Sequence, residues 1–92
     1  MKSVLQKERI CYQCGSPYVE EHHIFFGTSN RKQSEKYGLK IWLCPAHHRE
    51  APEAPHQNRK IDLAYKRMAQ EYFESRLGSR EEFRKLFGKS YL

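Results

Sequence analysis

The pattern of apolar and polar positions divides the chain into two parts of different character. In residues 1–57 the apolar residues form short runs broken by glycine and proline, whereas in residues 58–92 they recur every three or four positions. The first pattern is typical of short strands and turns, and the second of amphipathic helices. We therefore expect one domain of residues 1–92 with an α+β fold and a helical C-terminal part.

Two segments of the first part are predicted to be strands. Residues 19–26 are rich in valine, isoleucine and phenylalanine, and residues 39–43 alternate between apolar and polar side chains. Such segments favour strands, and Pro45 would end the second one. The polar segment between them at residues 27–32 is predicted to be a loop, because it contains glycine, serine and asparagine and no apolar residue.

The C-terminal part predicts two helices. The apolar stripe of the first helix contains Ile61, Ala64, Tyr65, Met68, Tyr72 and Phe73. We interpret this stripe as core packing, because helical spacing places these side chains on one face. Gly78 would end this helix, and the segment from Ser79 to Glu82 has the form of a capping box that opens a second one.

Charge and length narrow the range of functions. The chain has 17 basic and 11 acidic residues in 92, and the resulting net charge of +6 favours a polyanionic partner. A domain of this size buries a modest core, so a bound metal would add stability. No apolar run approaches the length needed to cross a membrane, and a reducing cytoplasm is the expected compartment.

The cysteines predict a structural zinc site. Cys11 and Cys14 form one CxxC half-site, and Cys44 and His47 form a second with the same spacing; 29 residues lie between the two half-sites. Thiolate and imidazole are preferred zinc ligands, and four of them close a tetrahedral site. His48 could replace His47 as the fourth ligand. We prefer His47 because its spacing from Cys44 matches that of the first pair.

A zinc site of this kind does not use the other histidines, and their placement resembles the HNH endonuclease family. The matching segments are residues 21–24 (Glu-His-His-Ile) and residues 43–48 (Leu-Cys-Pro-Ala-His-His). The segments His-Ile-Phe-Phe-Gly from residue 23 and His-Gln-Asn-Arg from residue 56 look like the small HNH proteins of bacteriophages and prophages. The resemblance implies a zinc-stapled ββα-metal (His-Me finger) core over residues 11–60. It also implies a phage-encoded protein that acts in a bacterial host cell.

The resemblance also implies roles for individual residues. His23 would be the general base, a role that suits imidazole because its unperturbed pKa is near neutrality. A catalytic divalent metal, which would be Mg²⁺, Mn²⁺, Ni²⁺ or Zn²⁺, would be bound by His22, His48 and His56. Asn58 would either bind this metal as a further ligand or orient the groups around it. The implied activity is metal-dependent hydrolysis of DNA phosphodiester bonds.

The chain departs from the family pattern at three points. Leu39 stands where the family has its asparagine, so another residue such as Asn30 would take the orienting role. Pro52 stands where the family has its last metal ligand, so His56 would substitute for it. Adjacent strand residues point to opposite faces, so the paired histidines of the first strand can share a site only at a strand end or a bulge.

DNA is the expected partner. Arg31, Lys32 and Arg59 flank the motif and are the basic residues that we expect to contact phosphates. No segment indicates base reading, so weak sequence preference is expected, and a second copy or a protein partner is a further expectation. The main alternative is a non-catalytic zinc-finger module that binds DNA or RNA. Another is a zinc domain that uses its C-terminal helices to contact a protein.

Overall fold

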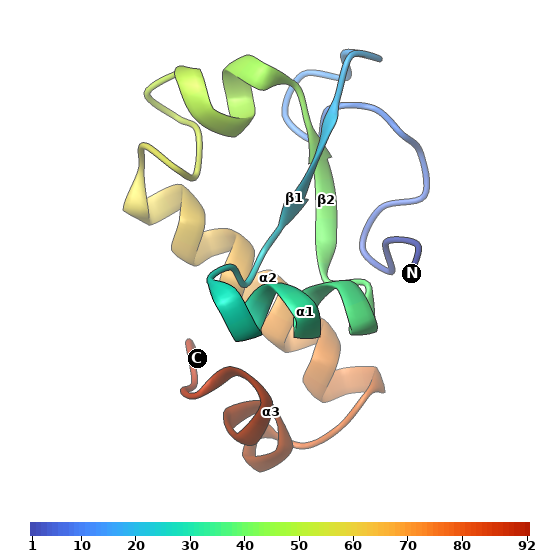
Figure 1. The fold of residues 1–92 in the computed structure, drawn as a ribbon, viewed down its shortest axis with the longest axis vertical. Helices are drawn as coiled ribbons and strands as arrows, with labels where there is room; N and C mark the ends of the chain where they lie inside the picture. Colours follow the sequence, from blue (N-terminus) through green and yellow to red (C-terminus); the bar gives the residue numbers. More distant parts are fainter.

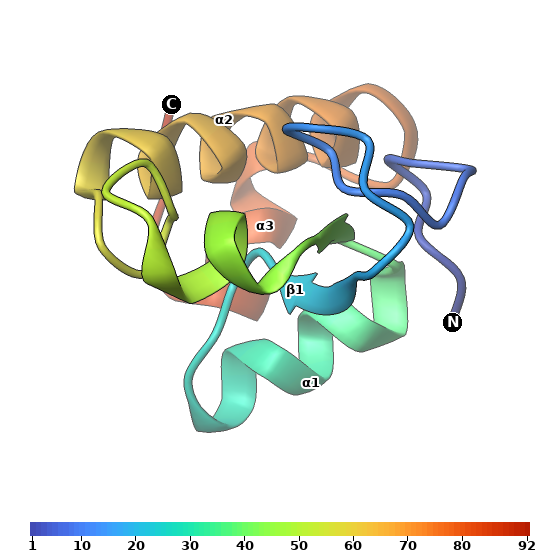
Figure 2. The ribbon, with the colours of Figure 1, turned by 90° about the horizontal axis from the view of Figure 1, so that it is seen from above.

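The computed structural model describes all 92 residues and has two strands and four helical segments. In chain order these are β1 (Glu20–His23), α1 (Thr28–Tyr37), β2 (Lys40–Leu43), η1 (Ala46–Glu50), α2 (Arg59–Arg76) and α3 (Arg80–Phe87). The strands lie side by side near the centre of the molecule (Figure 1). Seen from above, α2 lies on one side of the strand pair and α1 on the other (Figure 2). The mixed helix and strand content agrees with the expected α+β class.

β1 and β2 form an antiparallel sheet whose two faces have different roles. The paired residues are Glu20 with Leu43, Glu21 with Trp42, His22 with Ile41, and His23 with Lys40. Cross-strand partners share a face and neighbours along a strand alternate. We call the face with His22 and Ile41, which are both fully buried, the inner face, and the face with Glu21, His23, Lys40 and Trp42 the outer face.

The prediction of a loop at residues 27–32 is wrong, because α1 begins at Thr28. The helix is held by Ser34, whose buried hydroxyl donates to the Phe25 carbonyl (2.7 Å) and accepts from the Phe25 N–H (3.0 Å). Gly38 ends α1 in the left-handed conformation, with a φ of 70°. Since Ser34 is the only fully buried residue of α1, the helix carries no apolar stripe that the sequence pattern could show.

The predicted first strand is longer than the observed one. Only Glu20–His23 form β1, and the next two residues, Ile24 and Phe25, leave the strand to enter the core, where neither is exposed. Phe25 packs there against Phe83 and Phe87 of α3, with ring centroids 5.2 and 4.5 Å away.

The predicted C-terminal helices are confirmed. The capping box at the start of α3 is present, since Ser79 accepts from the Glu82 N–H and Glu82 accepts from the Ser79 N–H. Gly78 lies just after the end of α2, as expected. Neither of these helices, nor any other in the chain, is both long and apolar enough to cross a membrane.

The segment before β1 contains no helix or strand and runs along the free edge of β2. The Val4 N–H donates to the Gly38 carbonyl (3.0 Å), and the Tyr12 N–H donates to the Trp42 carbonyl (2.8 Å). The Trp42 N–H donates to the side-chain oxygen of Gln6 (2.8 Å). These bonds satisfy the exposed edge of β2 and bring the CxxC turn beside the end of the strand.

Candidate metal centres

The four residues predicted to hold zinc lie together at the end of β2. Cys11 and Cys14 come from the turn before β1, Cys44 follows β2, and His47 lies on η1. The Cys14 and Cys44 sulfur atoms are 3.8 Å apart, and His47 Nδ1 lies 3.2 Å from the Cys44 sulfur and 3.9 Å from the Cys11 sulfur. A tetrahedral zinc with bonds of about 2.3 Å to sulfur places two sulfur atoms about 3.8 Å apart. This Cys₃His cluster fits a metal ion such as zinc.

The chemistry around the Cys₃His cluster also suits a cation. Burial opposes ionisation of the Cys11 thiol, but backbone hydrogen bonds, led by that from Cys44, lower its pKa to about 6. A thiolate at this position is the form that binds zinc. The other ring nitrogen of His47 faces Glu53, with 3.6 Å between Nε2 and Oε1. The alternative assignment of His48 to this cluster is not observed.

A second cluster contains the imidazoles of His22, His48 and His56. Their ring centroids are 4.9 to 5.3 Å apart, and the Nε2 atoms of His48 and His56 are 3.3 Å apart. Two nitrogen ligands of one tetrahedral zinc would be about 3.3 Å apart, given bonds of about 2.0–2.1 Å. The spacing therefore fits two ligands of one ion.

His22 contributes to this cluster a buried ring nitrogen that has no partner in the protein. The residue is 99% buried and its Nε2 has no hydrogen-bond partner, which costs roughly 1–3 kcal/mol for a buried polar group. Burial, together with the neighbouring His48 and His56, lowers the pKa of His22 to about 3. The ring is therefore neutral at physiological pH and its lone pair is available to a metal ion.

Glu20 orients the second cluster. Its Oε1 lies 2.6 Å from Nδ1 of His48, so Nδ1 carries the proton and Nε2 is left free to face the other imidazoles. A carboxylate in this position fixes the tautomer of a metal-binding histidine and makes it more basic. Glu20 is on the inner face of the sheet two residues before His22, and the alternation of a strand could have identified it from the sequence.

His23 lies on the outer face of the sheet and is not a member of the cluster of three imidazoles. Its Nε2 is 2.8 Å from Oε1 of Glu35 on α1, and Glu21 is also close, at 3.7 Å. His23 is the last residue of β1, and a cavity of about 190 Å³ at that point is lined by both His22 and His23. His22 and His23 were expected to share a site only at a strand end or at a bulge, and in the structure they do so at the end of the strand.

Glu35 was not identified from the sequence, because nothing in α1 indicates that it reaches the first strand. Hydrogen bonds from the N-terminal amino group, His23 and Lys40 lower the pKa of Glu35 to about 2, so its side chain is a carboxylate. Lys40 Nζ lies 3.0 Å from both oxygens of Glu35 and 3.2 Å from Glu21. Glu35 therefore only accepts hydrogen bonds, and His23 must carry its proton on Nε2.

The predicted phosphate-binding residues lie in three neighbouring pockets. Arg31 lines the cavity that contains the histidines, together with Arg49, which the sequence analysis did not select. Lys32 lines an adjoining pocket of about 780 Å³ that also contains His23. Arg59 lines a pocket of about 350 Å³ beside His56.

The expected role of Asn58 as a metal ligand is not supported. Its side-chain oxygen caps α2, accepting from the N–H groups of Lys60 (3.0 Å) and Ile61 (3.3 Å). Leu39 is completely buried in the core, and Asn30 lies on α1 without lining any pocket. Neither Asn30 nor Asn58 therefore lines the cavity that contains His22, His48 and His56.

Comparison with known proteins adds no assignment: no family model, curated protein or solved structure matches this chain.

Proposed function

We propose that the chain is a metal-dependent DNA endonuclease of the HNH type, with a ββα-metal core formed by β1, β2 and the helical segment η1. The observation that carries this proposal is the cluster of His22, His48 and His56, whose ring nitrogens are spaced as candidate ligands of one ion. The Cys₃His cluster alone would suffice for a non-catalytic zinc module. The buried His22 ring with its unpartnered nitrogen has no purpose in such a module, and it would gain a partner from a second ion.

The local fold explains how one short segment would serve two metal sites. In η1 the adjacent residues His47 and His48 point to different clusters, His47 to the cysteines and His48 to the other histidines. The turns of residues 51–57 then return the chain so that His56 completes the second cluster. In this arrangement the structural zinc would fix η1 and thereby the position of His48.

The proposed chemistry divides between the metal and His23. A divalent ion held by His22, His48 and His56 would supply Lewis-acid stabilisation of the charge on the scissile phosphate and the leaving oxygen. His23 would take a proton from the attacking water. Because Glu35 holds the proton of His23 on Nε2, the nitrogen that accepts the water proton is Nδ1.

The charges around the cavity support a phosphodiester substrate. Arg31 and Arg49 line the cavity of His22 and His23, where the only carboxylate is that of Glu21. The planar guanidinium of an arginine can donate hydrogen bonds to two oxygens of one phosphate at the same time. A net charge of +6 on 92 residues adds general attraction to a nucleic acid.

The direct test is nicking of supercoiled plasmid by the zinc-loaded protein with added Mg²⁺, Mn²⁺ or Ni²⁺, or with a chelator. We expect metal-dependent nicking, and two metal ions per chain by elemental analysis. His23→Ala should abolish nicking while keeping both metal ions. His56→Ala should abolish nicking and lose one ion, because it removes a ligand of the second cluster only.

Two outcomes would contradict the proposal in different ways. Nicking by His23→Ala at the wild-type rate would exclude His23 as the base. The absence of nicking with every metal, together with one ion per chain, would instead favour the non-catalytic zinc module that binds DNA or RNA.

A further inference from the structure

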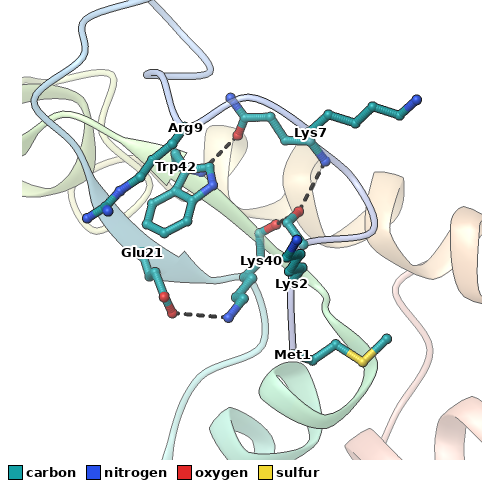
Figure 3. Close-up of a pocket in the computed structure, with 9 residues that line it drawn as sticks. Met1, Lys2, Lys7, Arg9, Glu21, Lys40 and Trp42 are labelled. Atoms are coloured by element: carbon teal, nitrogen blue, oxygen red, sulfur yellow. Dashed lines mark hydrogen bonds and ion pairs between the residues drawn. The ribbon is translucent and has the colours of Figure 1, made fainter.

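A basic pocket of about 720 Å³ lies between the N-terminal segment and the outer face of the sheet. Figure 3 shows the side chains that line it, with Arg9 running along the ring of Trp42 and with Glu21 and Lys40 below them. The proposed cleavage chemistry does not use Arg9, Trp42 or the lysines of the N-terminal segment.

The main chain of Trp42 is anchored to the N-terminal segment beside this pocket. Both of its main-chain polar groups are bonded to the N-terminal segment, the N–H to Gln6 and the carbonyl to Tyr12, each at 2.8 Å. The guanidinium carbon of Arg9 lies 4.8 Å from the centre of the indole ring. A planar guanidinium over a fixed, half-buried aromatic ring is a surface on which a nucleobase can stack.

The charges of the pocket favour a strand with phosphates. Lys2, Lys7 and Arg9 are exposed and line it. Lys40 adds no positive charge that is free to bind a phosphate, because its ammonium group is already bonded to Glu21 and Glu35. The exposed cations therefore come from the N-terminal segment, and Lys40 forms the floor of the pocket.

The sheet register relates this pocket to the proposed cleavage site. Trp42 is paired with Glu21, and His23 lies two residues further along β1 on the same face. Two residues of a strand span about 7 Å. A stacked DNA strand advances about 3.4 Å along its axis per nucleotide, and an unpaired strand can extend further. A DNA strand whose phosphate lies beside His23 therefore reaches the pocket within about two nucleotides.

We propose that this pocket binds an unpaired nucleotide of the DNA strand next to the cleaved phosphate, with its base stacked on the Arg9–Trp42 pair. Stacking needs an exposed base face, and the bases of a regular duplex are already stacked on each other. The substrate class is therefore DNA that has unpaired nucleotides beside the cleavage site. This inference rests on the proposed function for the identity of the nucleic acid and for the position of the cut.

The test uses the fluorescence of Trp42, which is the only tryptophan of the chain. Zinc-loaded His23→Ala protein is titrated with a single-stranded oligonucleotide of about 12 nucleotides, long enough to fill the pocket, and with a duplex of the same length. We expect saturable quenching by the single strand, with an affinity at least fivefold higher than for the duplex. Quenching does not require cleavage. The fluorescence test can therefore succeed where the nuclease assay fails, and the nuclease assay can succeed where the fluorescence test fails.

Two arginine variants separate stacking from charge, with affinities measured by anisotropy of a labelled oligonucleotide. Arg9→Ala should weaken single-strand binding roughly 5- to 150-fold, the range for loss of one base-stacking partner. Arg9→Lys keeps the charge but not the planar group and should recover less than half of that loss in free energy. Arg76→Ala is the matched control, because Arg76 also lies over an aromatic ring (Tyr72, 5.4 Å) but lines none of the pockets.

The proposal is overturned if the single strand fails to quench Trp42 or binds no better than the duplex. It is also overturned if Arg9→Ala and Arg76→Ala have equal effects, since binding would then depend on total charge. Trp42→Phe should keep part of the single-strand preference because a ring remains. If this variant is folded and binds as wild type does, the indole is not the stacking platform.

Discussion

Replacing Glu20 by glutamine tests whether the three-histidine cluster is a metal site. The carboxylate of Glu20 lies 2.6 Å from Nδ1 of His48, and its side chain is 44% exposed. The amide keeps the shape of the side chain but loses the charge that makes His48 a better ligand. We therefore expect Glu20→Gln to weaken metal binding at the cluster while leaving the Cys₃His cluster loaded.

The expected loss follows from the geometry of this contact. Removing a carboxylate that supports a metal-binding histidine lowers metal affinity roughly 10- to 100-fold. Because water reaches almost half of the Glu20 side chain, the lower end of this range applies, a loss of about tenfold or ~1.4 kcal/mol. The assay is isothermal titration of Ni²⁺ into protein whose cysteine cluster is already loaded with zinc.

Glu53→Gln is the matched control for this experiment. It makes the same change of charge beside a histidine, but that histidine is His47 of the other cluster, 3.6 Å away. Its Ni²⁺ affinity should therefore stay at the wild-type value. Equal Ni²⁺ affinities for Glu20→Gln and Glu53→Gln would refute the assignment of Glu20, and the absence of Ni²⁺ binding to wild type would refute the cluster itself.

Three further predictions concern the zinc, the cap of α2 and the core. Cys14→Ser should lose the structural zinc and lower the melting temperature, because such a site contributes about 10–16 kcal/mol whereas whole domains are stable by only about 5–15 kcal/mol. Elemental analysis measures the zinc content and circular dichroism the melting temperature, and an unchanged melting curve would contradict the prediction. Asn58→Ala should cost about 1 kcal/mol of stability through the lost cap and leave Ni²⁺ affinity unchanged. A large loss of affinity in that titration would make Asn58 a ligand after all. Phe83→Ala should lower the free energy of unfolding, measured in urea, by about 3–5 kcal/mol, since the side chain is fully buried between Phe25 and Phe73. A loss below about 1 kcal/mol would show that α3 is dispensable for the core.

The parts that could be predicted from the sequence are those with short-range physical causes. The helical periodicity from Ile61 to Phe73 and the Ser79–Glu82 capping box involve residues three or four positions apart, and both predicted helices are present. The matched spacing of the two zinc half-sites also has a local cause, since each pair must turn back on one ion. The structure brings those four residues together as expected.

The errors arise where a segment is held by contacts that its own pattern does not show. The first part of α1 was predicted as a loop because residues 27–32 include no apolar side chain, and the position of the helix depends on Ser34 bonding to the backbone of Phe25. Asn58 was predicted to ligate or orient at the metal site, but its side-chain oxygen caps α2 instead. In both cases a polar side chain satisfies backbone groups, which composition alone does not reveal.

The sequence by itself determined the α+β class, the C-terminal helices and the types of metal ligand, because these depend on periodicity, spacing and side-chain chemistry. Only the tertiary structure decided how the ligands are divided. Adjacent residues of a strand point to opposite faces, so His22 joins His48 and His56 inside while His23 meets Glu35 outside. The pairing of Glu20 with His48 and the stacking of Arg9 on Trp42 join residues 28 and 33 positions apart, and only folding brings such residues together.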